Sequence, residues 1–152
     1  MAKKRKHQVK IGDVYAVPLD TLNLRYGYVR MYRDPNIAIL AVTSRNQILS
    51  LEEIKKYPIV LDAFALRTSI EKGLWPLIGN IPFENEEEEW PGPRKQVSKI
   101  RPDVRMVVYK GHFISEEKFG EYDNLPEYKK LTDEHLIEEI NLNPTLYHHI
   151  EK

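Results

Sequence analysis

Residues 26–43 read YGYVRMYRDPNIAILAVT and contain two strand-like runs separated by a turn. The first run, residues 26–33, is rich in aromatic and β-branched residues, which favour strands. Asp34-Pro35-Asn36 has the composition of a turn. Residues 37–43 are continuously apolar, which is typical of a strand buried on both faces. We therefore expect a β-hairpin here, with its second strand at the centre of a sheet.

Further strands are predicted on both sides of this hairpin. Residues 14–17 precede it and end at Pro18, which lacks an N–H and so places the strand's end at a sheet edge or a bulge. After the hairpin, strands are expected at residues 59–66, at residues 74–81 as a bent edge strand, and at residues 105–110 as the last strand, before a turn at Gly111. Residues 82–93 are expected to form a long loop.

Two helices are predicted from their capping residues. Ser50 and Glu53 match a capping box that opens a short helix over residues 51–57. Thr132 can cap a second helix, whose apolar stripe includes Leu136 and Ile140. Strands come first and a terminal helix follows, so we expect an α+β fold. Its expected architecture is a curled, mostly antiparallel sheet (a partial barrel) with a short helix between strands and a C-terminal helix.

The length of 152 residues suits a single domain over residues 1–152. Within it we expect a flexible basic tail over residues 1–9, a sheet-rich core over 9–112 and a helical C-terminal extension over 113–152. The sequence has no cysteine for disulfides or thiolate chemistry. No apolar run approaches the ~20 residues that span a bilayer. We expect a cytoplasmic protein.

Charge is balanced overall but unevenly placed. The 23 Lys and Arg residues equal the 23 Asp and Glu residues, which argues against nucleic acid as the main partner because phosphate binding depends on clustered positive charge. The basic residues cluster in the tail, at Lys3, Lys4, Arg5, Lys6 and Lys10, and an acidic run lies at Glu84 and Glu86, Glu87, Glu88 and Glu89. Beside Trp90, that run could meet a basic groove on a partner protein, or it could be a solvated loop.

The predicted strand at residues 26–33 has two distinct faces. Tyr26, Tyr28, Arg30 and Tyr32 share one face by the period of two, and the intervening residues share the other. Tyrosines pack well inside a sheet, so we prefer to place them in the core. If the face is exposed instead, Tyr28, Arg30 and Tyr32 would form the Tyr/Arg mixture that is enriched at interface hot spots.

No arrangement of residues names a reaction. The five histidines form no metal-binding pattern, and no phosphate loop or nucleophile elbow is present. We therefore predict no catalytic residue, no metal and no cofactor. Asp62 stands within an apolar strand, where we expect its side chain to face solvent. A metal-dependent hydrolase using Asp62 or His112 is left as a third alternative.

Two segments resemble a known family. Residues 11–19, IGDVYAVPL, are followed closely by YGYV at residues 26–29, and residues 73–83 read GLWPLIGNIPF. The first pair is similar to the Gly-Asp-(aromatic)-Ala-x-Pro-Leu opening and Tyr-x-Gly-x-Val strand of the immunity protein 26 family of bacterial polymorphic toxin systems, here with the glycine one place nearer. The later segment resembles that family's Trp-x-x-(apolar)-Gly-x-(apolar)-Pro-(apolar) block, which an acidic, Pro-containing loop also follows. The resemblance spans roughly residues 9–112.

The resemblance implies a non-enzymatic intracellular protein that binds and neutralises a toxin domain, often a nuclease. We expect the residues in its motifs to determine the fold: Gly12, Asp13, Pro18, Trp75, Gly79 and Pro82. A carboxylate-rich surface could occupy the positive cleft of a nuclease. The expected toxin contacts are Glu86, Glu87, Glu88, Glu89, Trp90, Tyr28, Arg30 and Tyr32. The alternative is a nucleic-acid-associated module, in which Lys3 to Lys6 bind phosphate while Tyr28 and Tyr32 stack on bases.

Overall fold

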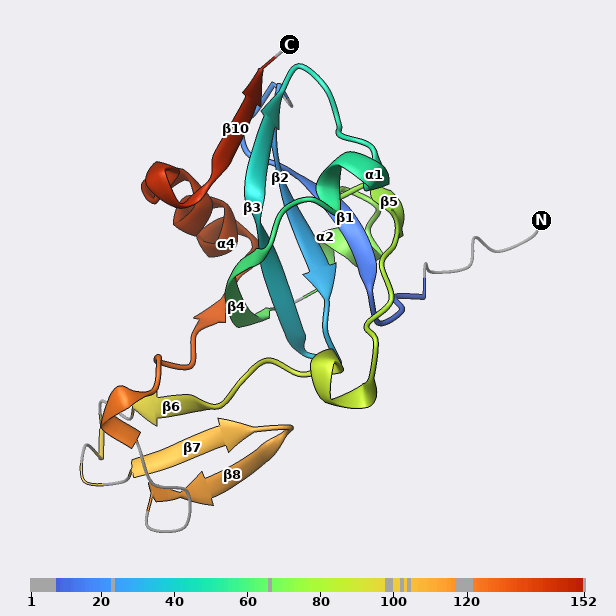
Figure 1. Cartoon of the computed structure of the whole chain (residues 1–152). Coiled ribbons are helices and arrows are strands. Elements are labelled where there is room, and N and C mark those ends of the chain that lie inside the picture. Colours follow the sequence, from blue (N-terminus) through green and yellow to red (C-terminus); the bar gives the residue numbers. More distant parts are fainter. Residues whose placement is uncertain are drawn as a thin grey trace, which may run out of the picture.

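The computed structural model describes residues 8–22, 24–65, 67–97, 100–101, 103, 105–116 and 122–151, and these form two β-sheets (Figure 1). The main sheet has seven strands in the order β5 (Leu77–Asn80), β1 (Asp13–Pro18), β2 (Arg25–Met31), β3 (Asn36–Arg45), β4 (Ile59–Ala65) and β9 (Lys130–Leu131), with β10 (His148–Glu151) also paired to β3. The small sheet has the order β6 (Arg94–Val97), β7 (Arg105–Tyr109) and β8 (His112–Ser115). The α+β class is confirmed, and neither sheet closes into a barrel.

The predicted hairpin is confirmed as β2 and β3, which pair antiparallel from Arg25↔Arg45 to Met31↔Ile37. β3 lies at the centre of the sheet because its other edge is shared by two strands. β4 pairs antiparallel with its first half, and β10 pairs parallel with residues 42–45. The segment over residues 113–152, expected to be a helical extension, also contains β10, which belongs to the main sheet.

Both faces of the main sheet are covered, which explains why β2 and β3 are so apolar. On one face, Val29, Met31 and Ile39 pack in a cluster with Trp75 and with Leu136 and Ile140 of a C-terminal helix. On the opposite face is a second cluster around a tyrosine: Val14, Ala16, Tyr28, Leu40, Val42, Leu49 and Ile54. The fold thus rests on two layers of apolar contacts, one on each side of the sheet.

Among the described residues, the sheet is flanked by the helices α1 (Leu51–Ile54), α2 (Thr68–Glu71) and α4 (Asp133–Leu142). Ser50 caps α1 by accepting a hydrogen bond from the Glu53 N–H at 3.3 Å, as predicted, but the helix ends at residue 54 and is shorter than expected. Thr132 caps α4 in the same way through the His135 N–H at 3.1 Å. Gly27 lets α4 approach β2, because a Cβ there would lie 3.0 Å from Ile140 Cδ1.

The turn before β1 joins the first strand to the edge strand β5. Gly12 has a φ of 89°, and a Cβ at this position would lie 2.7 Å from the Ile81 carbonyl oxygen. Asp13 is buried and accepts hydrogen bonds from the Lys10 N–H and the Asn80 side-chain amide, both at 2.9 Å. Gly12 and Asp13 therefore have a direct geometric role in closing this corner of the sheet.

Three other family positions also make defined contacts. Trp75 is buried in the cluster beneath α4. Gly79 leaves room for α1, since a Cβ there would lie 3.0 Å from Leu51 Cδ2. Pro18 is the last residue of β1. It lies beyond residues 13–15, which are the part of β1 that pairs with β5.

The small sheet corrects the sequence prediction. β7 and the turn at Gly111 are found as predicted, but β7 is not the last strand, because β8, β9 and β10 follow it. β6 was missed because its sequence, RKQV, has a single apolar residue and no strand-like alternation. The expected loop over residues 82–93 contains a 3-10 helix, η1 (Glu86–Glu89).

Candidate functional site

A cleft of about 350 Å³ lies between the two sheets and is the candidate binding site. Five aromatic residues line it: Phe64, Trp90, Tyr109, Phe113 and Tyr128. Figure 1 shows the small sheet below the main sheet, with the β7–β8 turn directed toward the segment that carries η1. We call this space the aromatic cleft. Its volume falls in the range of ligand-binding pockets.

The small sheet forms one wall of the aromatic cleft through a single cross-strand row. Arg94 of β6 pairs with Val108 of β7, which pairs with Phe113 of β8, so the three side chains share one face. Lys110 and Gly111 join β7 to β8 with φ values of 51° and 78°, as a two-residue type I′ turn requires. This turn lies against Trp90, since a Cβ on Gly111 would lie 3.6 Å from the indole ring.

The opposite wall comes from the main sheet and from the segment that leads into β9. Phe64 of β4 and Tyr128 contact each other edge to face, with ring centroids 6.3 Å apart. Burial raises the pKa of the Tyr128 phenol above its ordinary value of 10. Asp34 and Pro35 of the β2–β3 turn complete this wall. The cleft is therefore built from segments that are distant in the sequence.

An ion pair joins the two sheets at the base of the aromatic cleft. Arg94 Nε donates to Asp62 Oδ1 at 3.0 Å, and Arg94 Nη2 donates to Asp62 Oδ2. The Asp62 side chain is only 10 % exposed, so the prediction that it faces solvent is wrong. The sequence could not show this because its partner lies 32 residues away. A bidentate pair of this kind fixes the orientation of β6 relative to β4.

Four residues of the acidic run form η1, directly before Trp90 of the aromatic cleft, and three of their carboxylates form ion pairs within the chain. Arg33 contacts Glu89 at 2.6 Å and Glu86 at 3.5 Å. Lys110 donates to Glu87 at 2.6 Å, and this hydrogen bond raises the pKa of Lys110. The run is thus tied to Lys110 of the cleft lining, and Trp90, which follows the run, lines the cleft itself.

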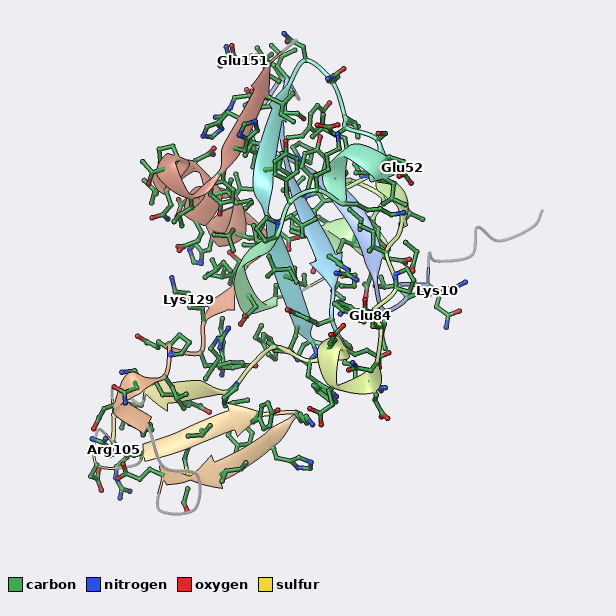
Figure 2. All side chains as sticks on the ribbon, in the orientation of Figure 1. Lys10, Glu52, Glu84, Arg105, Lys129 and Glu151 are labelled. Atoms are coloured by element: carbon green, nitrogen blue, oxygen red, sulfur yellow. The ribbon has the colours of Figure 1, made fainter. Side chains whose placement is uncertain are left out.

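These ion pairs leave carboxylates facing outward. The side chains of Glu86 and Glu87 are 82 % and 75 % exposed, whereas those of Arg33 and Lys110 are about one-third exposed. Asp34 repeats the pattern, with its carboxylate 76 % exposed and its partner Arg67 largely buried. The rim therefore presents negative charge to a partner, although each carboxylate is paired. Figure 2 places Glu84, at the start of this segment, at the end of the main sheet near the small sheet.

The tyrosine face of β2 is part of the core, as preferred above. Tyr28 has no exposed surface, and its hydroxyl contacts Ser44 Oγ at 2.6 Å and accepts from the Leu49 N–H at 2.9 Å. Tyr32 is also buried and stacks on Phe83 with centroids 5.4 Å apart. The expectation that Tyr28 and Tyr32 contact a toxin is therefore wrong. Base stacking by these two rings, on which the nucleic-acid alternative depended, is excluded for the same reason.

Arg30 fastens the segment after β5. Its Nε and Nη2 donate to the Ile81 carbonyl at 2.9 and 2.6 Å, and Nη2 also donates to the Pro82 carbonyl at 3.0 Å. Its guanidinium lies 3.7 Å from the centre of the Phe83 ring. Burial lowers the pKa of Arg30, which makes these carbonyl partners necessary. Arg30 is thus a structural residue, and Pro82 contributes to the fold through its carbonyl.

The remaining predicted features lie away from the cleft or outside the description. His149 belongs to β10, where Nδ1 contacts Thr43 Oγ1 at 2.5 Å and Nε2 contacts the Pro144 carbonyl at 2.8 Å. Lys3 to Lys6 lie outside the described residues. Within the described residues, no group of three or more His, Asp or Glu side chains could hold a metal ion. No helix in the described part of the chain is long and apolar enough to cross a membrane.

The structure defines a small α+β protein of two sheets with an aromatic-lined cleft between them. Comparison with known proteins identifies the group to which it belongs. The model of the family immunity protein 26 matches residues 10–102, more than half of the chain, so the chain belongs to this family. Its function is accordingly of the immunity type. Neither the curated proteins nor the solved structures gave a match.

The matched region contains only part of the aromatic cleft. Phe64, Trp90 and Arg94 lie within residues 10–102, whereas Tyr109 and Phe113 lie beyond them. Sequence reasoning singled out Trp90 and the acidic run but missed the other aromatic residues of the cleft. The available signal was the Lys110-Gly111 turn shortly before Phe113. This turn predicts a hairpin, but it does not predict which surface of the protein the hairpin faces.

Proposed function

We propose that this protein neutralises a cognate toxin domain by binding it directly and without catalysis, in the cytoplasm of the cell that it protects. Membership in the immunity protein 26 family supports the general role. The observation that carries the proposal is the aromatic cleft, where Phe113 is 63 % exposed although four other aromatic residues line the same space. Exposed aromatic groups gathered in a concave surface are typical of interaction sites.

The charge at the rim supports a basic toxin. Glu86, Glu87 and Asp34 present their carboxylates outward at the mouth of the cleft. A nuclease has a positively charged active site for phosphate, and carboxylates can occupy such a site. We therefore keep η1 and Trp90 in the proposed contact surface and propose that the toxin is a nuclease.

The test uses the toxin domain encoded in the gene adjacent to this one, which we call the adjacent toxin. Co-expression should restore the growth of cells that produce this domain. In vitro, increasing amounts of the immunity protein should abolish toxin activity when the two are equimolar, because direct binding is stoichiometric. Neutralisation by far less than one immunity protein per toxin would indicate catalysis and contradict the proposal. Failure to form a complex by size-exclusion chromatography would also contradict it.

A further inference from the structure

The aromatic cleft has an apolar interior and a charged rim, and the two parts differ in what they can bind. Inside, the accessible surface is mostly carbon, from Trp90, Pro91, Val108, Tyr109 and Phe113. Arg94 also lines the interior, but Asp62 and the Pro93 carbonyl occupy its donors. The interior therefore lacks an unpaired charge among the described residues and suits an apolar group. Its volume of about 350 Å³ accommodates one large aromatic side chain with part of its backbone.

The rim is asymmetric in charge. On the η1 side, the outward groups are the carboxylates of Asp34, Glu86 and Glu87, while their cationic partners lie deeper. A cation accompanies Phe64 of the other wall: Lys130 Nζ lies 6.0 Å from the centre of its ring. A partner that places basic groups over η1 and an apolar group in the interior would match both features.

We infer that the aromatic cleft receives an aromatic side chain from the toxin surface and that Lys or Arg residues beside this anchor meet the carboxylates of Asp34, Glu86 and Glu87. This inference rests on the proposed function and names the chemistry of the partner at the same site. The inference assigns different kinetic roles to the interior of the cleft and to its rim. Burial of the anchor controls dissociation, because it desolvates the centre of the interface, whereas the exposed carboxylates control the association rate.

The first test fills the cleft. Val108→Trp places a large side chain in the middle of the Arg94–Val108–Phe113 row, and Ile114→Trp is the matched control on the other face of the same sheet. Surface plasmon resonance with the adjacent toxin should show dissociation at least about 30-fold faster for V108W, the size of a hot-spot loss, and a near-native rate for I114W. Phe113→Ala is the second variant, since this exposed ring contributes little to folding, and Leu142→Ala is its exposed control.

These measurements distinguish the inference from the proposed function. If the unmodified protein binds the adjacent toxin and V108W and F113A dissociate at its rate, the inference is wrong and the proposed function stands. If the unmodified protein does not bind the adjacent toxin, both are wrong. If V108W and F113A dissociate faster while I114W and L142A do not, the inference is supported.

The second test needs no toxin. The peptides acetyl-Lys-Trp-Lys-amide and acetyl-Glu-Trp-Glu-amide carry the same aromatic anchor with opposite flanking charges. In NMR titrations up to about 10 mM, where millimolar binding is detected, the basic peptide should shift the amide signals of Gly92, Gly111 and Phe113. The acidic peptide should bind at least about threefold more weakly at low salt. Equal binding of the two peptides, or no shift with either, would overturn the assignment.

Discussion

The two sheets of this protein are stabilised in different ways. The main sheet is covered on both faces by clusters of buried apolar side chains, with Ile39 in one and Tyr28 in the other. In the small sheet, Val107 is the one fully buried apolar residue among those described. The small sheet is attached instead by polar links, including the Asp62–Arg94 pair and the hydrogen bonds of the Lys95 backbone with Pro126 and Tyr128. Its apolar side chains therefore remain accessible in the aromatic cleft.

This difference separates the scaffold from the binding surface. Apolar burial contributes most of the free energy of folding, and a sheet that is covered on both faces has little surface left for a partner. A sheet held by ion pairs keeps its side chains exposed at the cost of lower local stability. The following predictions test this division, beginning with the largest effect.

The largest loss of stability is expected from the centre of the main sheet. Ile39→Ala should lower the free energy of unfolding by about 3 kcal/mol, because the residue is fully buried and its removal leaves a cavity. Val107→Ala in the small sheet should lower the free energy of unfolding by about 1 kcal/mol, because it removes a smaller side chain from a sheet with less apolar burial. Urea denaturation followed by circular dichroism measures both. Equal losses would contradict the assignment of the main sheet as the scaffold.

The link between the sheets is expected to matter next. Asp62→Asn should lower the free energy of unfolding by about 2 kcal/mol, because it leaves the Arg94 charge without its partner. This loss lies between those typical of breaking buried and exposed ion pairs. Amide hydrogen exchange should accelerate in β6–β8 and stay slow in β3. Glu52→Gln, which breaks the exposed pair with Lys55, is the control and should change little. Uniform acceleration in both sheets would show that they do not unfold separately.

The main sheet should also lose stability at alkaline pH. Burial raises the pKa of Tyr32 to about 12, above its ordinary value of 10, so the folded protein holds this proton more tightly than the unfolded chain. The resulting stability is present below pH 10 and is lost as the pH rises toward 12. Tyr32→Phe should reduce the fall in unfolding free energy across this window by about 2 kcal/mol, the equivalent of the two-unit difference in pKa. An unchanged pH dependence would contradict the burial of this phenol.

The smallest expected effect is on association. Removing two exposed carboxylates with Glu86→Gln and Glu87→Gln should slow association with the adjacent toxin about threefold and flatten its salt dependence. The double variant Glu52→Gln and Glu138→Gln has the same net charge and lies away from the cleft; Figure 2 shows Glu52 on α1, well apart from Glu84. Stopped-flow fluorescence measures both. Equal slowing in the two double variants would mean that overall charge, not the rim, sets the rate.

The sequence predicted the parts of the fold that depend on local patterns. The β2–β3 hairpin follows from two apolar runs around a turn, and the caps at Ser50 and Thr132 follow from short-range hydrogen bonds. The strands that were missed depend on distant partners. β9 has only two residues, too few for a sequence pattern. β10 is a strand because it pairs with residues 42–45 of β3, beyond the part of β3 that pairs with β4.

The candidate site was predictable only in part. An acidic run beside Trp90 is visible as a sequence feature; Trp90 lines the cleft, and Glu87 of the run is paired with Lys110 of the lining. The ion pairs that its glutamates form with Arg33 and Lys110 are not visible, because those residues lie far away in the chain. The aromatic cleft itself depends on how the small sheet is placed against the main sheet, which the Asp62–Arg94 pair fixes.

The most direct measurement is the hydrogen–deuterium exchange footprint of the adjacent toxin on the intact protein. Binding at the aromatic cleft predicts slower exchange in residues 86–92 and 107–113, with no change in α1 or β10. Slower exchange confined to α1 and β10, with the cleft segments unchanged, would place the interface elsewhere and contradict the division into scaffold and binding surface.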